Sequence, residues 1–160
     1  MATAMTDPSD ALKSFQQALA QGIIAPRKAE LHDDLLFLVD DANGKKRLTY
    51  ALKRDGVVVA LATFISADPI DGFHCFHVGY AVDEAYRSHG FGKDVTKKAF
   101  DELTNGFQRA GIPHLYVEAI IGISNEHSKK LATSVLSNSP NACTDAVSGQ
   151  AALQYVKQLF

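Results

Sequence analysis

The sequence predicts one α/β (α+β) domain in which helices flank a mixed, mostly antiparallel central sheet. The chain has 160 residues, of which 46% are hydrophobic and 21% are charged, as expected for a single globular domain. Short apolar segments separated by turn signals occupy residues 35–82 and favour antiparallel strands. From residue 91 onward, helical and strand patterns alternate, which favours helical crossovers on the same sheet.

The first predicted element is a helix that begins at Asp7-Pro8-Ser9-Asp10, where cap-type residues flank an early proline. Its apolar face is formed by residues at helical spacing, namely Leu12, Phe15, Leu19 and Ile23. Pro26 prevents the helix from continuing. The short apolar run 35–39 is followed by the turn signal Asp41-Ala42-Asn43-Gly44, so we expect it to be a strand.

Three further strands are predicted before residue 83. The dipeptide Asp55-Gly56 predicts a tight hairpin turn between the first two. Asp68-Pro69 and Asp71-Gly72 together predict the second turn. The predicted strands are 47–53, 57–65 and Phe73–Val82.

The rest of the chain alternates between helix and strand. An apolar stripe predicts a helix that ends near Ala110-Gly111, where glycine can adopt the left-handed conformation. Its members are Val95, Ala99, Leu103 and Phe107. A strand at 114–121 and a helix from Glu126 to about Leu136, capped by Ser124-Asn125, should follow. We expect the polar segment 137–149 to be a loop and residues 151–160 to form a last strand.

Composition excludes several classes of function. The net charge of −2 and the pI near 6.3 argue against a nucleic-acid binder that relies on a basic surface. Cys75 and Cys143 are too far apart for a metal or redox motif, and the six histidines are scattered, so we predict no metal site and a buried free thiol at Cys75. Residues 1–10 lack the pattern of a signal peptide, and no apolar run is long enough for a membrane span. We therefore expect a cytoplasmic protein without membrane contacts.

The segment YRSHGFGKDV, residues 86–95, places two glycines and several cationic groups at a strand-to-helix junction. It is not a P-loop, because Asp94 follows Gly92-Lys93, and it is not a dinucleotide fingerprint, because Val95 replaces the third glycine. A glycine-rich loop that opens a helix directs backbone N–H groups at one point and favours an anion there. A plain glycine turn with solvated cations is the alternative.

This segment resembles the Arg/Gln-x-x-Gly-x-Gly/Ala signature of the GNAT superfamily of N-acetyltransferases, whose loop holds the pyrophosphate of acetyl-CoA. Asn125 and Ser128 also match the Asn-x-x-Ser/Ala pattern of a later helix in that family. The similarity covers residues 48–136, and it is weak over 1–47, the N-terminal helix and first strand, and over 137–160, the polar loop and last strand. We interpret residues 1–160 as a single acetyltransferase domain.

The resemblance implies that acetyl-CoA lies in the splay between two central strands. Its pantetheine would pair with the main chain of the strand before the loop, and an amide near Val78 would polarise the thioester carbonyl as an oxyanion hole. The acetyl group would pass to a primary amine by direct attack in a ternary complex. The implied cofactor-binding residues are Tyr80, Ala81, Val82, Arg87, Ser88, His89, Gly90, Phe91, Gly92, Lys93, Asn125 and Ser128.

The general base and general acid are less well defined by the resemblance. The position of the catalytic glutamate of histone-type members corresponds to His74, and His77 is the other candidate, on the opposite face of an ideal strand. Either imidazole could remove the amine proton, or could simply be a histidine on a sheet face. The usual acidic tyrosine of the later helix is Ala132 here, so Tyr116, Tyr155, His127 or water could act instead.

The acceptor is not defined by the motifs. A small-molecule or a protein amine would fit, and Glu118 and Tyr116 are candidate substrate contacts on the strand that lines the gap. A non-catalytic acyl-CoA-binding or sensor domain is one alternative. An aminoacyl-tRNA-acetylating toxin of GNAT type is another, although the net charge does not favour RNA. The C-terminal strand could also pair across a homodimer.

Overall fold

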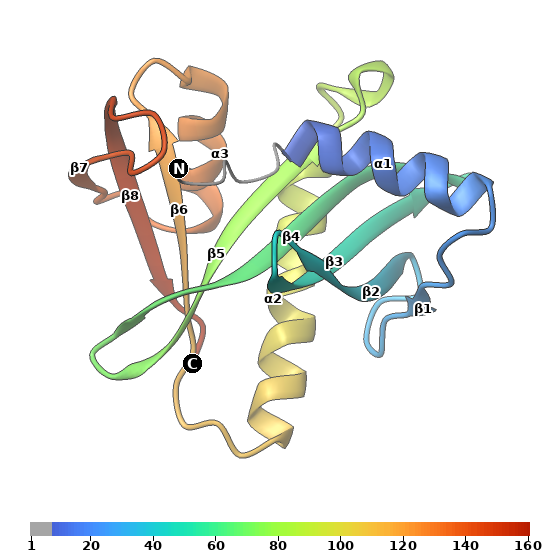
Figure 1. The fold of residues 1–160 in the computed structure, drawn as a ribbon, viewed down its shortest axis with the longest axis horizontal. Coiled ribbons are helices and arrows are strands. Elements are labelled where there is room, and N and C mark those ends of the chain that lie inside the picture. Colours follow the sequence, from blue (N-terminus) through green and yellow to red (C-terminus); the bar gives the residue numbers. More distant parts are fainter. Residues whose placement is uncertain (1–7) are drawn as a thin grey trace.

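A computed structural model describes residues 8–160 (Figure 1). The strands are β1 (Arg27–Lys28), β2 (Leu35–Ala42), β3 (Lys45–Arg54), β4 (Val57–Ile70), β5 (Phe73–Val82), β6 (Tyr116–Gly122), β7 (Asn141–Thr144) and β8 (Ala151–Gln158). The helices are α1 (Pro8–Ala20), α2 (Phe91–Arg109) and α3 (Glu126–Val135), and a 3₁₀ turn, η1 (Glu84–Tyr86), precedes α2.

The strands form one sheet in the order β1-β2-β3-β4-β5-β6-β8-β7. Every neighbouring pair is antiparallel except β5 and β6, which are parallel because α2 returns the chain along the sheet. Helix α1 crosses one side of β3 and β4, and α2 runs on the other side (Figure 1). The predicted single domain with a mixed, mostly antiparallel sheet is therefore confirmed.

Two apolar cores hold the helices on the sheet. The larger one lies between the sheet and helices α2 and α3, with Phe64, Leu103 and Val117 fully buried in it. The smaller one lies under α1 and contains Leu12 and Phe15. Burying side chains of this size contributes about 1.5–3 kcal/mol each.

The predicted first helix is confirmed, with a shorter apolar face. Leu12 and Phe15 are buried as expected, and Leu19 packs at the edge of the smaller core. Ile23 was wrongly assigned to this face: the helix ends at Ala20, and the Ile23 side chain is 71% exposed. The predicted start at Asp7 lies outside the described residues.

One predicted turn is wrong. Asp68-Pro69 does not turn, because β4 continues through both residues to Ile70. The pairing with β5 shifts register between Ala67 and Ile70, and such an irregularity tolerates a proline that has no N–H to donate. Asp71-Gly72 alone makes the turn, with positive φ angles of 50° and 79°.

Two short strands were not predicted. β1 has only two residues, and β7 lies inside the segment 137–149, which was expected to be a loop. Neither strand has an apolar alternation, because both lie at the edges of the sheet. β7 covers the outer edge of β8 over residues 151–154, so only the rest of β8 is open to a strand from another copy.

Cys75 is a buried free thiol, as predicted, and burial raises its pKa to about 12. None of the helices within residues 8–160 combines the length and apolar character that a membrane span requires.

Candidate active site

The central feature of the site is a gap between β5 and β6. The two strands pair at only three positions, Cys75 with Tyr116, Phe76 with Val117 and His77 with Glu118. Beyond His77 they diverge into a V (Figure 1). Within residues 8–160, the remaining part of β5 therefore pairs with β4 on one side and has no strand partner on the other. Its free main-chain groups line a slot that a ligand could enter.

A cavity of about 760 Å³ occupies this gap. It reaches from α1 to the start of α3, and residues 144–147, at the end of β7 and just after it, form a further wall. The size suits a ligand of ordinary small-molecule dimensions. The predicted site residues that line the cavity are His77, Val78, Tyr80, Glu118, Asn125 and Ser128.

The predicted anion loop lies at the N-terminus of α2. Gly90 is the N-cap residue and adopts the left-handed conformation with φ 77°. No side chain of the described part of the chain caps the helix, so its first N–H groups are available to a ligand. Arg87, Ser88 and His89 are exposed in the preceding turn, and Lys93 is exposed in the first helical turn. This arrangement of free N–H groups and cations suits a phosphate group.

Gly92 explains why α2 can begin so close to the gap. A Cβ atom at this position would lie 3.1 Å from Leu131 of α3 and 3.3 Å from Val82 of β5. The missing side chain lets the two helices and the strand converge. The N-terminus of α2 is thereby held beside the open end of the V.

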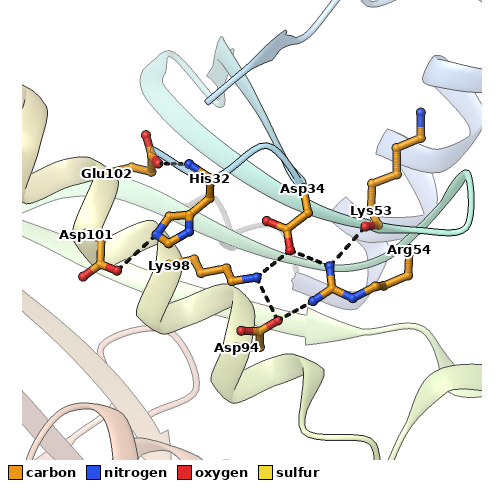
Figure 2. Close-up of polar contacts among 8 residues, drawn as sticks. All are labelled: His32, Asp34, Lys53, Arg54, Asp94, Lys98, Asp101 and Glu102. Carbon is orange, nitrogen blue, oxygen red and sulfur yellow. Dashed lines mark hydrogen bonds and ion pairs between the residues drawn. The ribbon is translucent and has the colours of Figure 1, made fainter. Parts of the chain in front are cut away.

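A cluster of four charged side chains anchors the first turn of α2 (Figure 2). Arg54, at the end of β3, donates to Asp34 at 2.6 Å and to Asp94 of α2 at 2.8 Å. Lys98 also pairs with both carboxylates. The Arg54 guanidinium lies 5.7 Å above the ring of Phe91, the residue between the two loop glycines. The cluster ties the anion loop to the sheet.

The two candidate histidines lie in different places. His77 is half-buried and lines the cavity on the α1 face of β5. His74 is exposed on the other face, where its ring lies 4.5 Å from Phe76 and 6.3 Å from Phe107, and it is not among the residues that line the cavity. The alternation of a strand separates them, as their spacing predicts.

Two carboxylates lie near His77. Burial lowers the pKa of His77, and the charges of Glu118 and Asp145 oppose that shift. Gln154 donates to Glu118 at 2.7 Å, and Asp145 accepts from the N–H of Val147 at 3.0 Å. Asp145 was not singled out from the sequence, because it lies in the turn after β7, a strand that no pattern predicted.

Tyr80 bridges the gap through its side chain. Its hydroxyl donates to the main-chain carbonyl of Ser128 in α3 at 2.8 Å. Burial raises the Tyr80 pKa to about 12, so the hydroxyl stays protonated. Asn125 caps α3, since its side chain accepts from the N–H of Ser128 at 3.1 Å. The sequence pointed to the main chain of Tyr80 and not to this cross-gap bond.

Gly79 was also missed. A Cβ atom here would lie 2.9 Å from the Pro8 side chain and 3.0 Å from Thr63. The glycine therefore lets α1 approach β5 beside the cavity. An isolated glycine within a strand pattern is the signal that could have identified it.

The remaining candidates for proton transfer are dispersed. Ala132, at the position of the usual acidic tyrosine, is fully buried in α3. Tyr155, a candidate acid, is only 2% exposed in the larger core. Tyr116 points elsewhere, since its hydroxyl lies 3.5 Å from Gln158 and the residue does not line the cavity. His127 is exposed on α3. Among residues 8–160, no group of three or more His, Cys, Asp or Glu side chains could hold a metal ion.

Comparison with known proteins identifies the family. The family model described as "Acetyltransferase (GNAT) family" matches residues 13–135, well over half of the chain. The chain belongs to the acetyltransferase (GNAT) family. It is therefore an acyltransferase by family. No curated protein matches its sequence.

Solved structures share the fold of this GNAT acetyltransferase at low identity. An acetyltransferase of the GNAT family from Streptococcus pneumoniae aligns with a TM-score of 0.53 and 12% identity, over 97% of this chain and 96% of that one. yncA from Salmonella typhimurium, solved with its cofactor acetyl-CoA, aligns with a TM-score of 0.53 and 18% identity, over 98% and 92%. RimL, a ribosomal L7/L12 alpha-N-protein acetyltransferase, aligns with a TM-score of 0.51 and 15% identity, over 71% and 70%.

Proposed function

We propose that this GNAT protein transfers the acetyl group of acetyl-CoA to a primary amine by direct attack in a ternary complex. One observation carries the proposal: an anion-binding helix N-terminus lies at the open end of a strand gap whose cavity contains a half-buried histidine and two carboxylates. The helix terminus would hold the pyrophosphate, and the cavity would hold the two reacting groups.

The co-substrate would be bound mainly by the main chain. The free N–H groups after Gly90 would hold the pyrophosphate, with Arg87 and Lys93 adding charge. The open edge of residues 80–82 would pair with the pantetheine, and an amide near Val78 would stabilise the oxyanion of the attacked thioester. The similarity to yncA, whose structure contains acetyl-CoA, supports this choice of donor.

His77 is the base that we propose. An amine must lose a proton to attack, and a base within reach of that proton typically contributes 10²–10⁴-fold in rate. His77 lines the cavity, and burial keeps its pKa low, so the imidazole is neutral and able to accept a proton near neutral pH. His74 faces the other side of the sheet.

The acceptor that we propose is a cationic amine. Glu118 and Asp145 give the cavity two negative side chains close to His77, and Arg47, the one cation among the described lining residues, is paired with Asp40 at 2.6 Å. An ammonium group would be attracted there before it gives up its proton to His77. The thiol of CoA has an ordinary pKa of about 8.5, so its thiolate can leave without a proton from a tyrosine at position 132.

Two measurements test the function. Thermal-shift titrations should show stabilisation by acetyl-CoA and by CoA, and none by ATP. A ligand at 100 times its Kd adds about 2.7 kcal/mol to the free energy of unfolding. Release of CoA with a panel of primary amines should then show turnover. The absence of any shift would reject the proposed cofactor site.

A non-catalytic acyl-CoA binder is the second candidate, and Ala132 favours it because the usual acidic tyrosine is missing. The two functions differ in one result. A binder would be stabilised by acetyl-CoA and would release no CoA with any amine.

A further inference from the structure

A second cavity, of about 420 Å³, lies away from the proposed active site. It is formed by β1, β2 and β3 on one side and the C-terminal half of α2 on the other. None of its lining residues also lines the gap between β5 and β6. Its volume lies within the range of small-molecule sites.

The inner walls of this cavity are apolar. Phe37, Leu48 and Tyr50 come from the strands, and the Phe37 and Tyr50 rings lie 4.9 Å apart. Leu103 and Phe107 come from α2. Gly106 also lines the cavity, and a Cβ atom added to it would meet nothing within 4 Å. The space beside the helix is therefore open and suited to an aromatic or aliphatic group.

The acidic residues at the rim are already engaged. Glu102 is 6% exposed, and its carboxylate accepts from the main-chain N–H groups of residues 30, 31 and 32 at 2.8–3.1 Å (the bond to His32 is drawn in Figure 2). Glu30 pairs with Arg109 at 2.7 Å. Both carboxylates keep their negative charge, and Glu30 also attracts the guanidinium of Arg27.

The basic residues at the rim are not engaged in the same way. Arg27 and Lys28 form no ion pair with any residue in the described range 8–160, and the Arg27 guanidinium lies 5.9 Å above the Phe37 ring. The described lining residues include three cations, Arg27, Lys28 and Arg109, and two carboxylates, Glu30 and Glu102, so the net charge of the lining is +1. This net positive charge would complement an anion.

Tyr50 provides a polar group inside the cavity. The side chain is only 7% exposed, yet within residues 8–160 its hydroxyl has no hydrogen-bond partner. Burial, with the charges of Glu102 and Glu30, raises its pKa, so the hydroxyl is protonated and can donate. No buried side-chain polar atom of the described residues lacks a partner, so the Tyr50 hydroxyl must reach the open space of the cavity, where a ligand oxygen could accept from it in place of water.

We propose that this cavity binds a small amphipathic carboxylate. Its aromatic or aliphatic body would lie between Phe37 and Leu103, its carboxylate would face Arg27 and Lys28, and an oxygen would accept from Tyr50. Such a ligand would occupy a site separate from the one where acetyl-CoA and the amine are proposed to bind.

The test uses two probes of the same shape, 4-phenylbutanoate and the uncharged 4-phenylbutanol. Calorimetric titration of the full chain, in the presence of saturating CoA, should show saturable binding of the carboxylate and binding of the alcohol that is about tenfold weaker. Arg87→Ala should leave carboxylate binding unchanged, which separates this site from the anion loop.

Three variants locate the site. Gly106→Leu should fill the cavity without a loss of melting temperature and should weaken both probes at least about tenfold. Arg27→Gln should weaken binding of the carboxylate and not of the alcohol, whereas Lys45→Gln, at the exposed start of β3, should change neither. The proposal is overturned if neither probe binds, or if binding survives Gly106→Leu. It is equally overturned if sedimentation shows a dimer that Gly106→Leu dissociates, because a second copy would then cover the cavity.

Discussion

At the scale of single residues, His77 and His74 offer a direct test of the proposed chemistry. His77→Gln should lower kcat/KM by about 10²–10⁴-fold, because the amine loses its base, and should leave CoA binding intact. His74→Gln is the matched control, since it lies on the other face of the same strand, and it should retain activity. Equal losses in both variants would contradict the assignment of His77.

The pH dependence of the reaction follows from the environment of His77. Its folded pKa is below the ordinary value of about 6.5, because burial disfavours the charged ring. The neutral, active form therefore persists to a lower pH than for an exposed histidine, and kcat/KM should fall only below about pH 6.5. Asp145→Asn removes a charge that favours protonation, so it should shift the acidic limb to still lower pH. A shift toward higher pH would contradict the proposed contact.

Gly90 tests the anion loop. Gly90→Val should abolish CoA binding, because a branched side chain would block the approach of the phosphate to the backbone at φ 77°. Gly44→Val, in a turn with φ 79°, carries the same backbone strain away from the site and should lower stability while CoA still binds. Arg87→Ala should weaken binding by about 1.5–3 kcal/mol. Calorimetry on the three variants checks the assignment.

At the scale of elements, the ion-pair cluster makes the start of α2 part of the sheet. Arg54→Met would leave Asp34 and Asp94 with Lys98 as their only cation in the cluster and would loosen the loop around Phe91. We expect a loss of stability of about 1 kcal/mol and weaker CoA binding. Arg109→Met removes an exposed ion pair at the far end of the same helix and should leave CoA binding unchanged.

The cluster also predicts a response to acid. Partial burial would raise the pKa of Asp34, but hydrogen bonds from Lys98 and Arg54 outweigh it, and the folded pKa lies below its ordinary value. A carboxylate with a lowered folded pKa stabilises the fold above its unfolded pKa and loses that contribution as the pH falls through the folded value. The Arg54→Met defect in stability should therefore shrink below about pH 4. A defect that persists unchanged at low pH would argue against this origin.

Gly79 tests how α1 is held beside the cavity. Gly79→Ala places a methyl group 2.9 Å from Pro8, so the helix must move or the strand must yield. Overpacking of this kind costs about 1–3 kcal/mol, and the amine KM should rise because α1 forms part of the cavity wall. Gly122→Ala, whose Cβ would meet nothing within 4 Å, is the control for a glycine at the end of a strand. A melting curve identical to the wild type would show that α1 adapts freely.

At the scale of the whole molecule, the sequence was most informative where local chemistry decides the structure. The strand Phe73–Val82 and the cap at Asn125 are where the residue patterns placed them, because turns, caps and apolar periods are local signals. The edge strands β1 and β7 could not be predicted, because their pairing depends on neighbours distant in the chain. Asp145 and the cross-gap bond of Tyr80 depend on the same long-range packing.

The two halves of the sheet should become less independent when acetyl-CoA binds. Strands β1–β5 and strands β6–β8 meet at only three paired positions, and the Tyr80 hydroxyl spans the gap to α3. A ligand that pairs with the open edge of β5 would join the two halves. Its binding free energy would stabilise strands β6–β8 and α3 against local unfolding. Hydrogen exchange should therefore slow in β6, β8 and α3 on addition of acetyl-CoA. Exchange in β3, which is already paired with β2 on one side and β4 on the other, should not change. Uniform slowing across the chain would place the ligand elsewhere, and slowing confined to residues 86–93 would mean that the anion loop binds while the gap stays empty.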